Sequence, residues 1–270
     1  MSRLATTFTE LEKTGRKALI PFITAGDPHP DFTVPMMHAM VEAGVNVIEL
    51  GVPFSDPMAD GPVIQRASER ALAHKMSLRK TLAVAAEFRK TNQTTPVVIM
   101  GYLNPIEAMG YEAFANAAQA ADIDGVLTVD LPPEEAAECT ALLKARGIDP
   151  IFLLAPNSTD ERIEKMNSLG SGYLYYVSLK GVTGAGHLNT ADVEQKLHQI
   201  KARTNLPVGI GFGVKDADIA KAVAALGDGV VVGSALISKV EANLDNPERA
   251  KQEICELLSA MRLAMDSVGA

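Results

Sequence analysis

Short apolar runs alternate with longer helical patterns along the whole chain, and this alternation is the feature that most constrains the fold. The runs lie at residues 18–24, 45–51, 96–101, 125–130, 150–154, 172–178, 207–211 and 229–232. Because they are apolar without a polar face, they are typical of parallel strands that are buried on both sides. Parallel strands joined by helices predict an α/β fold.

The segments between these runs carry signals for the beginning and end of helices. Asn246-Pro247-Glu248 offers a cap, a proline at the first helical position and an early acid. Residues 158–161, Ser-Thr-Asp-Glu, resemble a capping box. Gly44, Gly147 and Gly170 stand where helices are expected to stop.

Eight strand–helix units without a Pro/Gly/Ser-rich linker predict one closed (β/α)8 TIM barrel over residues 1–270. A doubly wound open sheet is the alternative. The stretch after the second strand has room for an extra helix at residues 62–73, before a helix that starts near Ser77. A short helix is expected at residues 235–240, after the eighth strand.

Composition limits the classes of partner and compartment. A hydrophobic content of 47% supplies a sizeable core, and a net charge of −8 argues against a nucleic-acid partner. No apolar run approaches the roughly 20 residues of a membrane span, and the N-terminus has no apolar signal segment. Cys139 and Cys255, far apart in the chain, suggest buried thiols in a reducing compartment, so we expect a cytoplasmic protein. The histidines are scattered, so no metal site is expected.

Two carboxylates belong to the second predicted strand and the loop that follows it. Glu49 points opposite to Ile48 and Leu50, near the carboxyl end of a strand, which is where barrel active sites lie. Apolar neighbours there would raise its pKa and let it donate as well as accept a proton. Alone, Glu49 also suits a rim ion pair and Asp60 a turn. Together on one strand–loop unit they suggest acid–base chemistry.

Glycines end the seventh and eighth strands, in Gly209-Ile210-Gly211-Phe212-Gly213 and in Gly233-Ser234. Barrels frequently bind phosphate at these two loops through backbone N–H groups and a short helix N-terminus. Tight turns alone would also use glycine, but the pair predicts a phosphate site. The glycine-rich sixth loop, residues 180–187, is expected to be a mobile lid or an ordinary surface loop, with Lys180 in solvent.

Residues 49–65, Glu-Leu-Gly-Val-Pro-Phe-Ser-Asp-Pro-Met-Ala-Asp-Gly-Pro-Val-Ile-Gln, resemble the signature of the tryptophan synthase alpha subunit family. The likeness extends over essentially the full chain, through residues 21–28, 181–184, 209–214 and 233–234. The family cleaves indole-3-glycerol phosphate to indole and glyceraldehyde 3-phosphate, a retro-aldol reaction without metal or cofactor. The resemblance therefore implies a lyase.

The resemblance also implies roles for individual residues. Glu49 would protonate the ring carbon and take the proton of the adjacent hydroxyl, and Asp60 would stabilise the ring N–H as positive charge develops. Thr183 would close the lid over Asp60, and Tyr175 would position Glu49 or the substrate. The phosphate would be held by Gly184, Gly211, Gly213, Gly233 and Ser234. The indole slot would be formed by Phe22, Met100, Leu127, Tyr175 and Phe212, which equally suit core packing; Met100 replaces the commoner leucine.

A second subunit is implied in the same way. Family members associate as an alpha2beta2 assembly with a beta subunit, which carries pyridoxal phosphate and receives the indole, so no cofactor is expected in this chain. The matching interface positions are Pro53, Asp56, Asn104, Asp130 and Pro132. Two other classes remain open from the sequence: a different phosphate-binding barrel enzyme, and a barrel that only activates a partner.

Overall fold

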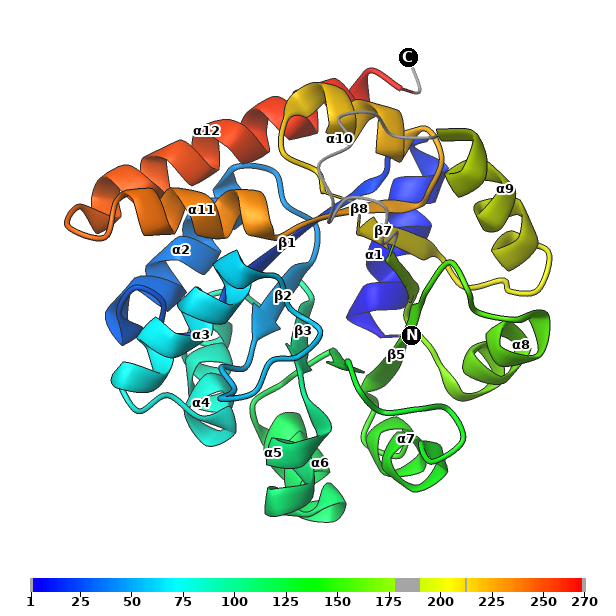
Figure 1. Cartoon of the computed structure of the whole chain (residues 1–270), viewed down its shortest axis with the longest axis horizontal. Coiled ribbons are helices and arrows are strands. Elements are labelled where there is room, and N and C mark those ends of the chain that lie inside the picture. Colours follow the sequence, from blue (N-terminus) through cyan, green and yellow to red (C-terminus); the bar gives the residue numbers. More distant parts are fainter. Residues whose placement is uncertain (1, 178–189, 212, 269–270) are drawn as a thin grey trace.

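The strands close into a parallel barrel in sequence order, with β8 pairing back onto β1 (Figure 1). The computed structural model describes residues 2–177, 190–211 and 213–268. The strands are β1 (Ala18–Thr24), β2 (Ile48–Gly51), β3 (Val97–Gly101), β4 (Gly125–Thr128), β5 (Asp149–Leu154), β6 (Leu174–Val177), β7 (Val208–Gly211) and β8 (Gly229–Val232). The barrel prediction is confirmed, and the open sheet is excluded because no edge remains between β1 and β8.

Helices surround the strands as an outer ring (Figure 1). Those in the described ranges are α1 (Arg3–Lys13), α2 (Pro30–Glu42), α3 (Pro62–Ala73), α4 (Leu78–Arg89), α5 (Leu103–Met109), α6 (Tyr111–Ala120), α7 (Ala137–Lys144), α8 (Asp160–Leu169), α9 (Thr190–Lys201), α10 (Ala217–Ala224), α11 (Ser234–Ala242) and α12 (Pro247–Asp266). None of them combines the length and apolar character that a membrane crossing requires.

The predicted elements agree with the structure most closely where apolar pattern and caps coincide. The extra helix α3 has the predicted bounds, and α4 begins after Ser77, whose side chain accepts the Lys80 N–H. The helix after β8 is longer than predicted. The second strand is shorter, since β2 begins at Ile48 although Val45 and Val47 are buried. Apolar character therefore extends beyond the hydrogen-bonded ladder.

One cap prediction needs correction. The segment at residues 158–161 is not a capping box, because Thr159 is the N-cap and accepts from the Arg162 N–H, while Ser158 accepts the Ala155 N–H. Gly170 ends α8 as predicted, in an extended conformation (φ −81°), whereas Gly44 and Gly147 have positive φ. The Asn246 cap of α12 is confirmed.

The N-terminal helix α1 was not expected from the sequence, and neither was the division of the β3–β4 connection into α5 and α6. Leu4, Phe8 and Leu11 form the buried face of α1, and they pack with side chains that point inside the barrel, such as Ile20 and Tyr173. These apolar positions recur at helical spacing. The helix therefore closes the N-terminal end of the barrel and leaves the carboxyl end for the site.

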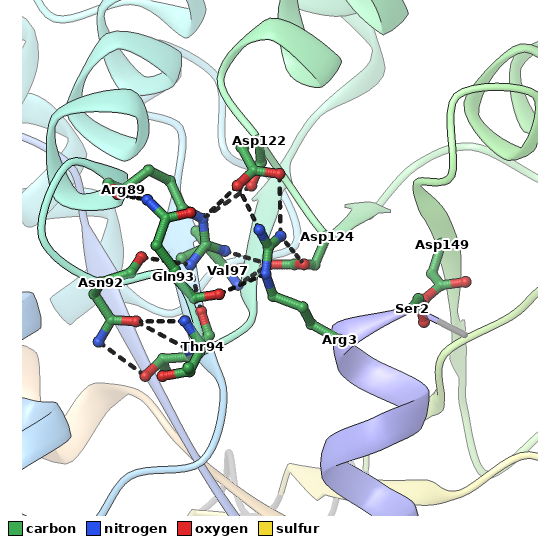
Figure 2. A network of polar contacts seen from close by, with 11 residues as sticks. Ser2, Arg3, Arg89, Asn92, Gln93, Thr94, Val97, Asp122, Asp124 and Asp149 are labelled. Atoms are coloured by element: carbon green, nitrogen blue, oxygen red, sulfur yellow. Dashed lines mark hydrogen bonds and ion pairs between the residues drawn. The ribbon is translucent and has the colours of Figure 1, made fainter.

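A network of charged side chains holds α1 in this position (Figure 2). Arg3 bonds to Asp122 and Asp124, which precede β4. Arg89, at the end of α4, bonds to Asp124 and also donates to the Thr95 carbonyl oxygen at 2.6 Å. Arg89 and Asp124 are each only 4% exposed. Buried charges of this kind are tolerated because they are paired.

Candidate functional site

Glu49 lies inside the barrel on β2 and is 0% exposed. The Tyr173 hydroxyl donates to its Oε1 at 2.5 Å, and its Oε2 has no hydrogen-bond partner among the described residues. Burial raises the pKa of Glu49 from 4.5 to about 8, although the bond from Tyr173 opposes the rise. The carboxyl group is therefore protonated at neutral pH and can act as a proton donor. Glu49 therefore faces inward, as predicted, and it does not form an ion pair at the rim of the barrel.

Asp60 lies in the loop between β2 and α3, and it is partly buried. The Tyr102 hydroxyl donates to its Oδ2 at 2.9 Å, and Gln65 Nε2 donates to its backbone oxygen at 2.8 Å. Burial raises the pKa of Asp60, and the bond from Tyr102 lowers it. The side chain is turned toward the barrel rather than used to make the turn.

A narrow cavity opens beside Asp60 at the carboxyl end of the first three strands. It is lined by Phe22, Thr24, Gly51, Val52, Asp60, Ile64, Ser68, Met100, Gly101, Tyr102 and Val129. Phe22 reaches over Gly51, where an added Cβ would lie 2.5 Å from the ring. The cavity has a largely apolar wall and one carboxylate, and its volume of about 10 Å³ makes it too small for a ring-sized ligand in this conformation.

Tyr175 connects the two carboxylates. It is buried on β6, and its pKa is raised well above the ordinary value by burial and by the nearby charges of Glu49 and Asp60. Glu49 does not line the cavity beside Asp60 in this conformation, since its carboxyl group turns toward Tyr173. Both acids therefore lie near Tyr175, but they do not line one cavity.

The structure brings the residues of the predicted indole slot together only in part. Phe22 and Met100 line the cavity, whereas Leu127 packs with Tyr175 in the barrel interior and does not line it. The physical reason is depth, since Leu127 is wholly buried one residue before the end of β4. Phe212 falls outside the described residues.

The predicted phosphate residues lie at two neighbouring strand ends. Gly233 is the N-cap of α11 without a side-chain capping bond, and Ser234 is the first residue of that helix. A helix N-terminus presents backbone N–H groups to an anion. Gly213 has φ +40°, and Gly211 ends β7. Gly184 and Thr183, together with Lys180, fall outside the described residues.

Gly211 has a second role that the sequence did not reveal. A Cβ at this position would lie 2.1 Å from the Tyr175 hydroxyl oxygen and 2.5 Å from the ring. Glycine is thus required so that the Tyr175 ring can lie across the end of β7. Close approach of a side chain, and not only of a phosphate, explains this residue.

Gly211→Ala is expected to displace Tyr175 and to lower the free energy of unfolding by about 1–3 kcal/mol, as overpacking usually does. Urea denaturation followed by circular dichroism measures the change. Gly209→Ala is the matched control, because its Cβ would meet the Tyr173 ring at an ordinary 3.4 Å. Equal stability of the two variants would contradict the steric role of Gly211.

The predicted partner positions share the rim that bears Asp60. Asp56 and Asn104 are exposed, Asp130 and Pro132 are partly buried, and Pro53 is buried within the chain. Asp130 Oδ1 accepts the Leu103 N–H at 2.7 Å, so this carboxylate also shapes the start of α5. The loop between β2 and α3, which carries Pro53 and Asp56, also carries Met58, whose side chain is 77% exposed.

Tyr102 and Tyr173 touch the candidate acids but were missed by sequence reasoning. Tyr102 directly follows β3 and Tyr173 directly precedes β6, and both lie outside the acidic signature. The inward direction of alternate residues was the available signal for Tyr173, since it shares its parity with Tyr175. Nothing in the sequence identifies Tyr102, whose contact joins two separate loops.

A larger cavity of about 990 Å³ lies at the opposite end of the barrel, between α1 and the loops that lead into β5, β6, β7 and β8. Phe8, Lys17, Asp149 and Asp228 are among its lining residues. We place the site at the carboxyl end despite the smaller volume there, because the raised pKa values of Glu49 and Asp60 belong to that end. In the described ranges no cluster of His, Cys, Asp or Glu could hold a metal ion.

Comparison with known proteins points to one family. The family model for the tryptophan synthase alpha chain matches residues 8–266. The alpha chain of Methylococcus capsulatus is 63% identical, over 99% of this chain and 100% of that one, and the alpha chain of Thioalkalivibrio sulfidiphilus is 58% identical, over 98% and 100%. A crystal structure of tryptophan synthase subunit alpha from Legionella pneumophila superposes with a TM-score of 0.93 at 45% identity, covering 99% of each chain. The chain therefore belongs to the tryptophan synthase alpha chain family.

Proposed function

We propose that this chain cleaves indole-3-glycerol phosphate into indole and glyceraldehyde 3-phosphate, the reaction known for its family. The observation that carries the proposal is the Glu49 carboxyl group, sealed inside the barrel on β2 with its pKa raised to about 8. Such a group holds a proton at neutral pH and can pass it to a base placed directly against it.

The reaction needs a group that first donates a proton and then accepts one. Indole leaves as a poor carbanion until the ring carbon that bears the glycerol chain has been protonated. Glu49 donates its proton to that carbon, and the ring becomes an iminium with its positive charge at nitrogen. The carboxylate then removes the proton of the side-chain hydroxyl; the hydroxyl oxygen forms a carbonyl, the carbon–carbon bond breaks, and its electrons restore the aromatic ring.

The neighbouring residues supply binding and charge. Asp60 accepts a hydrogen bond from the ring N–H and stabilises the positive charge, which is largest when the ring carbon is protonated. Phe22 and Met100 hold the ring, and Gly233 and Ser234 hold the phosphate at the N-terminus of α11. Glu49 must turn from Tyr173 toward the ring carbon, a change of side-chain rotamer within the barrel.

We further propose that the indole passes to a beta subunit. In the family the alpha chain carries no cofactor, and pyridoxal phosphate belongs to the beta chain. A solved structure of tryptophan synthase from M. tuberculosis, which is 35% identical and has a TM-score of 0.86 over 97% of this chain and 100% of that one, is of the ligand-free form. Asp56, Asn104, Asp130, Pro132 and Pro53 are the proposed contacts.

The proposal includes one domain over residues 1–270 and a cytoplasmic location. Among the described residues, a single ring of strands encloses the interior core, and both cysteines are free thiols. Cys139 is buried, whereas Cys255 is partly exposed, which differs from the expectation that both are buried. An exposed thiol without a partner is compatible with a reducing compartment.

The direct test is release of indole from indole-3-glycerol phosphate by the purified chain, alone and with a beta subunit. We expect slow release alone and faster release with the beta subunit. A panel of other sugar phosphates, assayed in parallel, is the control and should give no turnover. Turnover of another phosphate without indole would favour a different barrel enzyme, and failure of any phosphate ester to bind would favour an activator without catalysis.

A further inference from the structure

A single phenol oxygen, that of Tyr102, makes two contacts with the loop that carries Asp60. It donates to Asp60 Oδ2 at 2.9 Å and accepts the backbone N–H of Ala59 at 3.0 Å. The same atom therefore fixes the backbone before the acid and one oxygen of the acid itself. A hydrogen bond to an ionised carboxylate is stronger than one between neutral groups.

The phenol ring is also held in place by contacts other than these two hydrogen bonds. Tyr102 follows β3 directly and is buried, and its ring stacks on Phe54 with centroids 5.3 Å apart and planes at 27°. The next residue, Leu103, donates its N–H to Asp130 Oδ1 at 2.7 Å. Because ring and backbone are already ordered, little conformational entropy is lost when the hydroxyl binds Asp60.

We propose that Tyr102 is a positioning residue that anchors Oδ2 of Asp60 and so presents Oδ1 to the ring N–H of the substrate. This inference rests on the proposed function, in which Asp60 accepts that N–H. The bond to Tyr102 restrains rotation of the carboxylate, which lines the cavity, and leaves Oδ1 as the oxygen available to a ligand there. Correct aim matters most when the ring nitrogen becomes positive, and Tyr102 thus acts mainly on kcat.

The surroundings give the same hydroxyl an electrostatic role. Burial raises the pKa of Asp60, and the bond from Tyr102 opposes the rise. Among the described residues, the other titratable groups that interact electrostatically with this pair are Tyr175 on β6 and Asp130 after β4. Neither of them is a cation. Tyr102 therefore favours the ionised Asp60 that the reaction uses, and loss of its hydroxyl raises the pKa further.

Tyr102→Phe in the full chain tests the inference, because it deletes one oxygen and keeps the ring. We expect kcat for indole release to fall roughly 10- to 100-fold, as for loss of a hydrogen bond to a charged group, with KM changed by less than about twofold. The acidic limb of the kcat–pH profile should move to higher pH, since Asp60 is protonated at a higher pH in the variant. Melting temperatures establish that the variant is folded.

Tyr111→Phe is the matched control. Its hydroxyl donates to Glu107 Oε1 at 2.7 Å on the outer helices α5 and α6, far from the cavity lining. It should leave kcat, KM and the pH profile unchanged. A wild-type kcat and pH profile in Tyr102→Phe would overturn the inference, and so would a loss confined to KM. Absence of indole release by the wild-type chain would instead refute the proposed function.

A measurement without turnover checks the same point. Carboxyl ¹³C NMR of the aspartate-labelled protein follows the titration of Asp60, whose signal is assigned by its loss in Asp60→Asn. In Tyr102→Phe the midpoint should rise by about one pH unit, because one unit corresponds to about the free energy of one hydrogen bond. An unchanged midpoint would overturn the electrostatic part and leave Tyr102 as packing alone.

Discussion

Glu49→Gln is expected to lower kcat for indole release by roughly three orders of magnitude, within the range that acid–base residues usually contribute. Glutamine has the shape of glutamic acid but cannot donate a proton to the ring carbon or take one from the hydroxyl. The wild-type kcat should also fall as the pH rises through about 8, where Glu49 loses the proton that it donates. Steady-state indole release between pH 6 and pH 10 measures both effects.

The same variant has a second, opposite consequence for stability. Glu49 has a folded pKa of about 8 and an ordinary value of 4.5. In that interval the unfolded chain releases the proton while the folded chain retains it, so the wild type loses stability as the pH rises. Glu49→Gln lacks this loss, and its advantage over the wild type should grow by a few kcal/mol, at about 1.4 kcal/mol for each pKa unit.

Glu112→Gln, the same substitution at an exposed carboxylate on α6, is the matched control and should change neither property. The role of Glu49 would be wrong if its glutamine variant retained turnover within about tenfold of the wild type, a loss too small for an acid–base residue. A stability difference that stays constant with pH would show that burial does not raise the Glu49 pKa.

Arg89→Met should give the largest loss of stability, about 3–5 kcal/mol, because it removes one of the two arginine partners of the buried Asp124 carboxylate and the donor to several backbone oxygens. The Arg89 guanidinium binds Asp124 (Figure 2). It also donates to the Thr95 carbonyl oxygen. Arg3 still pairs with Asp124 at 2.8 Å, and the Val97 N–H still donates to the second carboxylate oxygen. The backbone oxygens of Asn92, Thr95 and Asp122 each lose the donor that Arg89 supplies. Urea denaturation at pH 7 measures the change.

Arg16→Met is the matched control. Arg16 also pairs with an aspartate, through two hydrogen bonds to Asp266, but it lies at the surface. Its side chain is 41% exposed and that of Asp266 is 34% exposed. Solvent screens this pair, and we expect a loss below about 1 kcal/mol. The deficit of Arg89→Met should shrink as the pH falls, because protonation removes the charge of Asp124, which has lost one of its two arginine partners and whose pKa burial already raises. Equal losses of stability in Arg89→Met and Arg16→Met would refute the conclusion that burial makes the Arg89 contacts the more important ones.

Local pattern was sufficient for most of the barrel. The apolar runs and helix caps lie within single segments, so β1, β8 and α3 have the predicted bounds. The helix α1 was not predicted, because a single amphipathic helix before the first strand has no neighbour in sequence that indicates its packing. Its position depends on the ring of inward side chains that only the closed barrel assembles.

For the two carboxylates, too, the sequence indicated their position in the chain but not the contacts that hold them. Alternation along β2 determined that Glu49 and Val47 share a direction, and the long acidic signature determined the family likeness. The state of Glu49, fully buried and bonded to Tyr173, depends on a residue 124 positions away in the chain. The anchoring of Asp60 depends in turn on Tyr102, which is 42 positions away.

Periodicity and signature thus determined from the sequence alone that the chain is a barrel with Glu49 on its second strand. Tertiary structure decided how the acids are held: Tyr173 and burial for Glu49, Tyr102 for Asp60, and the space at Gly211 for Tyr175. The physical reason is that direction along a strand is a local property of the backbone. Desolvation and hydrogen bonding arise only when distant strands meet at one end of the barrel.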